Sequence, residues 1–338
     1  MRNKMCAQLN ETRDEIRITS RDKSKAPFIL SQLILFQSRK KWGTVYALAT
    51  LVGLFCVPSS GLALSETDIK NISASVSNGI LLPASSFTII IGMYVFNDLV
   101  DADLDRSNGK KRPIPTGQVS KRDTWIFIIL TNAMGILLAS MTFNLASMII
   151  ALMIVSIGLM YSTPKVALKD RFMLKTLSIA VAMMLCAILG SSAYWDTKYI
   201  HDNTKIGSFI MPLHAVLMLG TMIFVTSPVS DAADITGDTM AGRRTIPIVI
   251  GRENTIKMAI LLTISMSAMS SLLYGLHTIG LVTTVSVTLI AIMTMVYMIR
   301  SLKQLHHTKS VLDPRKKTMP LHIMLQSALI IGAILFWI

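Results

Sequence analysis

The sequence predicts an all-α protein that crosses a membrane many times, as a bundle of about nine transmembrane helices. Of its 338 residues, 52% are hydrophobic and 15% are charged, whereas a soluble domain averages about 25% charged residues. The mean hydropathy is +0.55. The charged residues also avoid several apolar stretches of the roughly 20 residues that a helix needs to cross the hydrocarbon core. These observations exclude an ordinary soluble domain and favour a polytopic membrane protein.

The first segment, residues 1–26, is polar and mixed in charge, and we expect it to be a cytoplasmic tail. Residues 27–338 then form the transmembrane domain. Its first stretch, 27–37, is apolar but too short to cross, so we expect a half-helix at the interface. Nine segments are long enough to span the membrane: 42–64, 79–99, 124–142, 145–163, 172–195, 207–229, 256–277, 279–299 and 320–338.

The third and fourth spans, and the seventh and eighth, are separated by only a few residues and are expected to form tight antiparallel hairpins. Lys and Arg indicate the orientation, because cytoplasmic loops carry an excess of both. In this arrangement 30 of the 33 basic residues fall on the N-terminal side of the membrane. We therefore expect a cytoplasmic N-terminus and an external C-terminus. The net charge of +14 follows from this topology and requires no nucleic-acid partner.

Two acidic clusters share one spacing, with carboxylates at positions i, i+3 and i+7. The clusters are Asp98, Asp101 and Asp105, and Asp231, Asp234 and Asp238. On a helix this spacing places three side chains on one face, over about 10 Å along the axis. One cluster ends the second span and the other ends the sixth, so both are expected on the cytoplasmic side. Because the pattern is duplicated, it is more than the ordinary charge at a helix end. Asp103 falls off this face and is expected at the surface.

Six carboxylates in one place require cations, and hard oxygen ligands select Mg²⁺ or Ca²⁺. Mg²⁺ that is bound by carboxylates usually shares its coordination shell with substrate phosphates. The two clusters therefore predict a lipid-embedded site for a phosphorylated substrate, with all six aspartates as metal ligands and catalytic residues.

Candidate substrate-binding residues flank the clusters. Asn97 precedes Asp98 and Tyr94 lies one turn deeper, where each either lines the site or packs between helices. Basic residues suit phosphate recognition, although each of them alone is also explained as a cytoplasmic anchor. The basic candidates are Lys111 and Arg112 before a Pro-x-Pro-x-Gly loop, Lys165 and Lys169 after the fourth span, and Arg243 after the second cluster. Tyr161 ends the fourth span on the same side, and the basic run 39–41 admits the same two interpretations.

At these residues the sequence resembles the UbiA superfamily of intramembrane prenyltransferases. The family's motif NDxxDxxxD is met by Asn97, Asp98, Asp101 and Asp105, and its second motif, DxxDxxxD, by Asp231, Asp234 and Asp238. Nine helices and an N-terminus outside the membrane also match, so the resemblance covers about residues 28–338. The run from Arg112 to Gly117 is similar to the RPIPSG loop of digeranylgeranylglyceryl phosphate synthases and of chlorophyll synthases.

The resemblance implies Mg²⁺-dependent transfer of a polyprenyl group from an allylic prenyl diphosphate to an acceptor in the membrane, among membrane lipids. The first choice of acceptor is geranylgeranylglyceryl phosphate, in isoprenoid ether-lipid biosynthesis. An aromatic acceptor, in quinone or related biosynthesis, is the alternative. An ion-coupled transporter is a distant third interpretation, because transporters usually place their sites at the membrane midplane. No acidic or basic residue lies near the middle of a predicted span.

Overall fold

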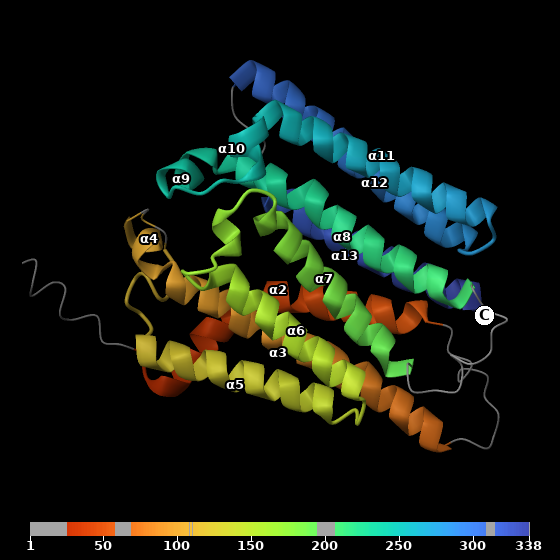
Figure 1. Ribbon diagram of the computed structural model, residues 1–338, viewed down its shortest axis with the longest axis horizontal. Coiled ribbons are helices and arrows are strands. Elements are labelled where there is room, and N and C mark those ends of the chain that lie inside the picture. The colour runs from red at the N-terminus through yellow and green to blue at the C-terminus, as the bar shows by residue number, and fades with distance from the viewer. Residues whose placement is uncertain are drawn as a thin grey trace, which may run out of the picture.

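The computed structural model describes residues 26–57, 69–107, 109, 111–194, 207–308 and 315–337. Within these ranges the chain is built from helices and contains no strand, which confirms the predicted all-α class (Figure 1). The predicted tail, apart from Ala26, lies outside the described residues.

Nine long helices occur in the described part of the chain, in agreement with the number of predicted spans. They are α2 (Phe28–Cys56), α3 (Ile69–Val100), α5 (Lys121–Ser140), α6 (Leu145–Ser162), α7 (Leu174–Ser191), α8 (Gly207–Ala233), α11 (Arg252–Gly275), α12 (Leu281–Thr308) and α13 (Arg315–Trp337). Eight of these nine, all but α2, contain a segment long and apolar enough to cross a membrane. Part of the first predicted span, 58–64, lies outside the described residues.

The expectation of a separate half-helix at 27–37 is wrong. Phe28–Cys56 is one continuous helix, and the basic run 39–41 lies inside it. No Pro or Gly separates the two apolar parts, and Arg and Lys are good helix formers. Arg39 also turns toward the protein, where it forms an ion pair with Asp98. The charge of Arg39 is therefore paired inside the protein, and α2 continues past this residue without a break.

α2 lies in the middle of the arrangement and packs against α3, α7 and α13. α3 also packs on α5 and α6, and α8 packs between α7 and α11. The pair of α11 and α12 runs along one edge of the bundle and α5 along the opposite edge (Figure 1). Large apolar side chains are exposed on both edges, for example Ile129, Leu130 and Leu261. Lipid tails are as apolar as leucine, so such surfaces suit a bilayer.

Two glycines allow α2 and α7 to cross in direct backbone contact. A Cβ atom on Gly53 would lie 1.7 Å from the carbonyl oxygen of Ala187, and one on Gly190 would lie 1.8 Å from that of Thr50. Small residues are common where membrane helices approach closely, because association there depends on packing. This crossing lies near the C-terminal ends of both helices.

The predicted hairpins are confirmed, and side chains cap the starts of two helices. Ser120 caps α5 by accepting a hydrogen bond from the backbone N–H of Asp123 (3.0 Å). Asn144 caps α6 directly after the turn that follows α5. A similarly short connection joins α11 to α12.

The shorter helices connect the long ones. They are α4 (Ala102–Ser107), η1 (Leu168–Asp170), η2 (Ser192–Tyr194), α9 (Ile235–Met240) and α10 (Ile246–Ile250). α4, α9 and α10 gather at one end of the bundle, and the C-terminus lies at the other (Figure 1). The end that carries α4 and α9 is where both acidic clusters lie.

Substituting Gly190 tests the backbone contact between α2 and α7. We expect Gly190→Ala to lower the thermal unfolding midpoint in detergent, because overpacking a close contact costs about 1–3 kcal/mol. Gly275→Ala is the matched control, since a Cβ atom there meets nothing within 4 Å. Equal midpoints for Gly190→Ala and the unchanged protein would show that the two helices do not touch in this way.

Candidate active site

Both acidic clusters lie where a long helix breaks and a short helix begins. α3 ends at Val100 and α4 starts at Ala102, so Asp101 lies in the break. α8 ends at Ala233 and α9 starts at Ile235, which places Asp234 in the equivalent position. The expectation of one unbroken helical face is therefore wrong at the middle aspartate of each cluster.

The breaks keep part of the helical hydrogen bonding. The N–H of Asp101 donates to the carbonyl of Asn97 (3.0 Å), and that of Asp105 donates to the carbonyl of Asp101 (2.8 Å). The N–H of Asp238 donates likewise to the carbonyl of Asp234 (3.1 Å). The helical rise is thus nearly preserved across each break, and the first and third aspartates still turn inward.

Two arginines neutralise the buried aspartates of the first cluster. Asp98 and Asp105 are 3% and 2% exposed. Arg39 donates two hydrogen bonds to Asp98, one of them from Nε to Oδ2 at 2.6 Å. Arg112 donates from Nη1 to Asp98 Oδ1 (2.9 Å) and to Asp105 Oδ2 (2.6 Å). A buried carboxylate without such a partner would be costly, so these pairs hold α2 and the loop after α4 against the end of α3.

The sequence did not decide whether Arg39 belongs to the site or is a cytoplasmic anchor. Its contacts place it in the site. Its guanidinium carbon lies 5.8 Å from the centre of the Tyr94 ring. Trp42 stacks on the same ring at 5.5 Å with an interplanar angle of 10°. Arg39 and Trp42 are three residues apart and so share a helix face, which is the signal in the sequence that could have identified them.

Lys169 and Asn97 come together at the middle aspartate of the first cluster. Lys169 Nζ donates to Asp101 Oδ1 (2.7 Å) and to Asn97 Oδ1 (3.2 Å). Ser162 donates to the same amide oxygen (3.2 Å). Lys169 is buried, and the η1 turn that carries it packs on α6 and α7.

Lys175 is a second residue that the sequence analysis missed. Its ammonium donates to Asp231 Oδ1 (2.8 Å) and to Asp238 Oδ2 (3.3 Å), the first and third aspartates of the second cluster. Lys175 falls at the start of the predicted fifth span, 172–195, and nothing in the sequence indicated a role for it. The other carboxylate oxygen of Asp231 is buried, and it accepts no hydrogen bond from the described residues.

Arg243 joins the two clusters. Its Nη2 lies 3.2 Å from both oxygens of Asp101, its Nη1 donates to Asp238 Oδ1 (3.4 Å), and its Nε donates to Asp170 Oδ1 (3.0 Å). Burial alone would lower the pKa of Arg243, but the three carboxylates outweigh it and raise that pKa above its ordinary value. Arg243 therefore remains charged, and residues of both clusters lie within the reach of one side chain.

Three predicted site residues lie less centrally. Asp234 is half-buried at the break between α8 and α9. Lys111 and Lys165 are exposed, and within the described ranges neither forms an ion pair with a cluster. Their roles in substrate binding stay predictions. Asp103 is 79% exposed and pairs with Arg106, in agreement with its expected surface position.

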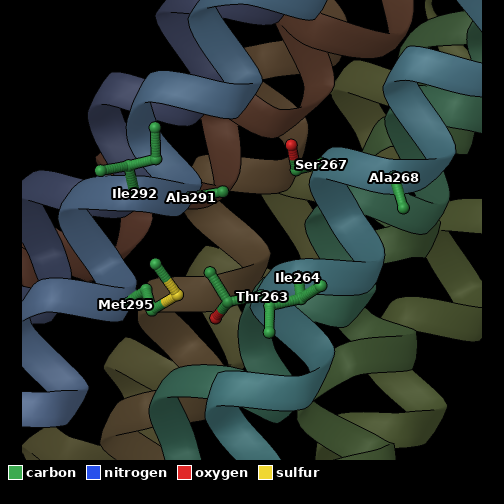
Figure 2. Close-up of a pocket in the computed structure, with 7 residues that line it drawn as sticks. All are labelled: Thr263, Ile264, Ser267, Ala268, Ala291, Ile292 and Met295. Atoms are coloured by element: carbon green, nitrogen blue, oxygen red, sulfur yellow. The ribbon is translucent and has the colours of Figure 1, made fainter.

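An apolar cavity of about 110 Å³ begins beside the first cluster. Asn97 lies at its polar end, and Tyr94, Tyr161 and Met93 line its walls together with residues of α2, α6 and α7. A larger hollow of about 290 Å³ lies between α11 and α12 (Figure 2). That hollow is lined by apolar and hydroxyl side chains without a charged group, and none of the aspartates borders it. The chemistry therefore favours the smaller cavity as the site.

The carboxylates fit a hard divalent cation by their chemistry. In the described part of the chain no three acidic, His or Cys side chains are close enough to hold a metal ion as they stand. The reason is that arginine and lysine groups lie between the aspartates. The donors are nevertheless all carboxylate oxygens, the ligands that Mg²⁺ prefers. The buried oxygen of Asp231 without a hydrogen-bond partner is one such donor.

Replacing Arg243 tests its role as the link between the clusters. We expect Arg243→Ala to lower the thermal unfolding midpoint, because each lost charge-assisted hydrogen bond costs about 1.5–3 kcal/mol. Arg243→Lys should recover only part of the loss, since lysine lacks the planar fork. Arg244→Ala is the control, because the Arg244 side chain is exposed. An unchanged midpoint in Arg243→Ala would contradict the linking role.

A family model described as the UbiA prenyltransferase family matches residues 54–311. A digeranylgeranylglyceryl phosphate synthase of Methanosphaera stadtmanae is 26% identical over 178 residues, which are 53% of this chain and 60% of that relative. This chain therefore aligns with less than two thirds of that relative's length.

Solved structures share the fold. A structure of a digeranylgeranylglyceryl phosphate synthase gives a TM-score of 0.64 at 20% identity and covers 91% of this chain and 99% of its own. A UbiA homolog from Archaeoglobus fulgidus bound to DMAPP and Mg²⁺ gives a TM-score of 0.63 at 18% identity, with the same coverage. At these identities the likeness establishes the fold alone.

The family match confirms the resemblance drawn from the two aspartate motifs. It also agrees with the prediction of a prenyltransferase. Mg²⁺, the predicted cofactor, is bound in the homolog from Archaeoglobus fulgidus. Together with the apolar helices, the family match identifies the protein as an integral, multi-pass membrane protein. The chain belongs to the UbiA prenyltransferase family.

Proposed function

We propose that this protein transfers a polyprenyl group from an allylic prenyl diphosphate to a lipid acceptor, geranylgeranylglyceryl phosphate. The observation that carries the proposal is the pair of aspartate clusters, joined by Arg243, at the mouth of an apolar cavity. Carboxylates and basic groups suit a metal-bound diphosphate, and an apolar cavity suits a hydrocarbon chain. The names of the aligned relatives support the choice of a glycerophosphate acceptor.

The six aspartates of the two clusters would hold Mg²⁺. When bound, Mg²⁺ neutralises the diphosphate and stabilises the charge that grows on it as it departs. Arg112 and Arg243, which pair with the aspartates, would donate hydrogen bonds to diphosphate oxygens that remain exposed, and Lys169 would extend the same basic lining. Arginine can meet two such oxygens in one planar fork.

The cavity would hold the first part of the prenyl chain. Tyr94 and Tyr161 line it beside Asn97, so the C1 atom of the donor would lie near the clusters and the chain would run toward the membrane interior. In the transfer, the bond between C1 and the diphosphate oxygen breaks, the acceptor hydroxyl oxygen bonds to C1, and the hydroxyl proton is lost. Apolar walls exclude the water that would otherwise capture the carbocation-like C1.

A product assay tests the activity and the acceptor together. Protein in membranes is incubated with Mg²⁺, labelled geranylgeranyl diphosphate and a panel of glycerophosphate and aromatic acceptors, and products are identified by mass. We expect the digeranylgeranylglyceryl phosphate product, which is lost with EDTA and restored by Mg²⁺. A product only from aromatic acceptors would overturn the choice of acceptor, and no product from any acceptor would overturn the activity.

The same assay tests the metal-binding role of the aspartates. We expect Asp98→Asn and Asp234→Asn to lower the rate of transfer by more than about a hundredfold. Replacing even a residue that only hydrogen-bonds to a metal ligand typically costs about 10–100-fold in metal affinity or activity. Asp103→Asn should retain transfer, since Asp103 is exposed and away from the cavity. Gel filtration establishes that each variant is folded. Near-normal turnover in the first two variants would remove the clusters from the mechanism.

We further propose that the aspartate clusters and the N-terminus face the cytoplasm. With Cys6, Cys56 and Cys186 replaced, we expect Thr116→Cys to be labelled by an impermeant reagent only after the cytoplasmic side is opened. Phe143→Cys, in the exposed turn between α5 and α6, should be labelled from outside. The reverse pattern would overturn an orientation that rests on the distribution of basic residues.

A further inference from the structure

Side-chain cations already balance the two acidic clusters. Among the described residues, the carboxylates of Asp98, Asp101, Asp105, Asp231 and Asp238 form ion pairs with side chains of the protein. The partners are Arg39, Arg112, Lys169, Lys175 and Arg243. A divalent cation that approaches the site alone therefore meets little net negative charge. A diphosphate that arrives with it brings the missing negative charge.

Lys175 has the same place in the second cluster that Arg112 has in the first, between the first and third carboxylates. Its ammonium lies between the first and third carboxylates of the second cluster, Asp231 and Asp238, and it is 12% exposed. A cation that uses both of these carboxylates needs the same space. The arginines approach their carboxylates through planar guanidinium groups, whereas a lysine ammonium is a point charge on a flexible stem with three rotatable donors. Of the two cations that bridge the first and third carboxylates of a cluster, Arg112 and Lys175, Lys175 is thus the one better able to change partners.

We propose that Lys175 is an internal counter-ion of the second cluster, so that a divalent cation enters this cluster only together with a diphosphate. The proposal deepens the proposed function, on which it rests. Lys175 stabilises Asp231 and Asp238 while the donor is absent, since buried carboxylates without a partner are costly. When the diphosphate binds, its oxygens accept the hydrogen bonds that the ammonium gives up.

The charges explain why the two ligands depend on each other. A divalent cation placed beside the ammonium is repelled, and the repulsion grows as the surroundings become less polar. If the ammonium withdraws without a new partner, a buried charge loses its hydrogen bonds. A diphosphate removes both costs. The relation is reciprocal, so the cation must strengthen diphosphate binding by the same factor.

Metal binding tests this proposal without a measurement of transfer. Purified protein in nanodiscs is titrated with Mn²⁺, with and without inorganic pyrophosphate, and free Mn²⁺ is followed by electron paramagnetic resonance. The proteins are the unchanged chain, Lys175→Met, Lys175→Arg and Lys257→Met. Lys257 is a matched control, because it lies 57% exposed on α11 and pairs only with its neighbour Glu253 in the described structure.

Without pyrophosphate, we expect Lys175→Met to bind Mn²⁺ about ten to a hundred times more tightly than the unchanged protein, which is the equivalent of one charge-assisted hydrogen bond. The strengthening of Mn²⁺ binding by pyrophosphate should shrink by the same factor. Without pyrophosphate, Lys175→Arg, which keeps the charge, should bind Mn²⁺ as weakly as the unchanged protein does. Lys257→Met should behave as the unchanged protein does both with and without pyrophosphate.

Equal Mn²⁺ affinities for Lys175→Met and the unchanged protein without pyrophosphate would overturn the proposal. Tight binding of Mn²⁺ to both clusters of the unchanged protein without pyrophosphate would also overturn it, even if Lys175→Met does not fold. Failure of the proposed function looks different, because the unchanged protein would then form no prenylated product with any acceptor. Equal Mn²⁺ affinities together with normal transfer would reject the counter-ion role of Lys175 without contradicting the proposed function.

Discussion

The structure depends on one constraint, the burial of several carboxylates at the end of an apolar bundle. A buried charge is tolerated only when it is paired and hydrogen-bonded. Each inward aspartate of the first cluster accordingly contacts a basic residue from another segment: Arg39 from α2, Arg112 from the loop after α4, and Lys169 from the connection before α7. These pairs hold distant parts of the chain against the end of α3. The requirement to neutralise the acids therefore also assembles the site.

The same constraint connects the fold to the proposed chemistry. Cations that hold the carboxylates in the absence of the donor are suited to a diphosphate once it binds, so the proposed exchange of partners would expose no charge. Arg243 contacts both clusters and Asp170, and it would keep the clusters together during such an exchange. The apolar cavity begins at Asn97, directly beside these charges. A prenyl diphosphate has this same division between a charged head and an apolar chain.

The sequence predicted the helices and the acidic clusters because both depend on local patterns. Apolar length identifies a span, and the repeated aspartate spacing identifies the site. The ion pairs depend instead on tertiary contacts: Arg39 and Asp98 are 59 residues apart, and nothing near Lys175 indicates Asp231. Basic residues at span ends serve equally as topological anchors, which is why Lys111 and Lys165 looked as plausible as Lys169. The helix breaks at Asp101 and Asp234 were missed because neither is marked by a Pro or Gly at the break itself.

A structure with Mn²⁺ and a prenyl diphosphate analogue that cannot transfer its chain would show whether the clusters hold the metal ion and the cavity holds the chain. Anomalous scattering would identify the Mn²⁺. We expect Mn²⁺ between the carboxylates of the two clusters, with the prenyl chain entering the cavity beside Tyr94 and Tyr161. Mn²⁺ away from both clusters, or a prenyl chain in the hollow between α11 and α12, would contradict this arrangement.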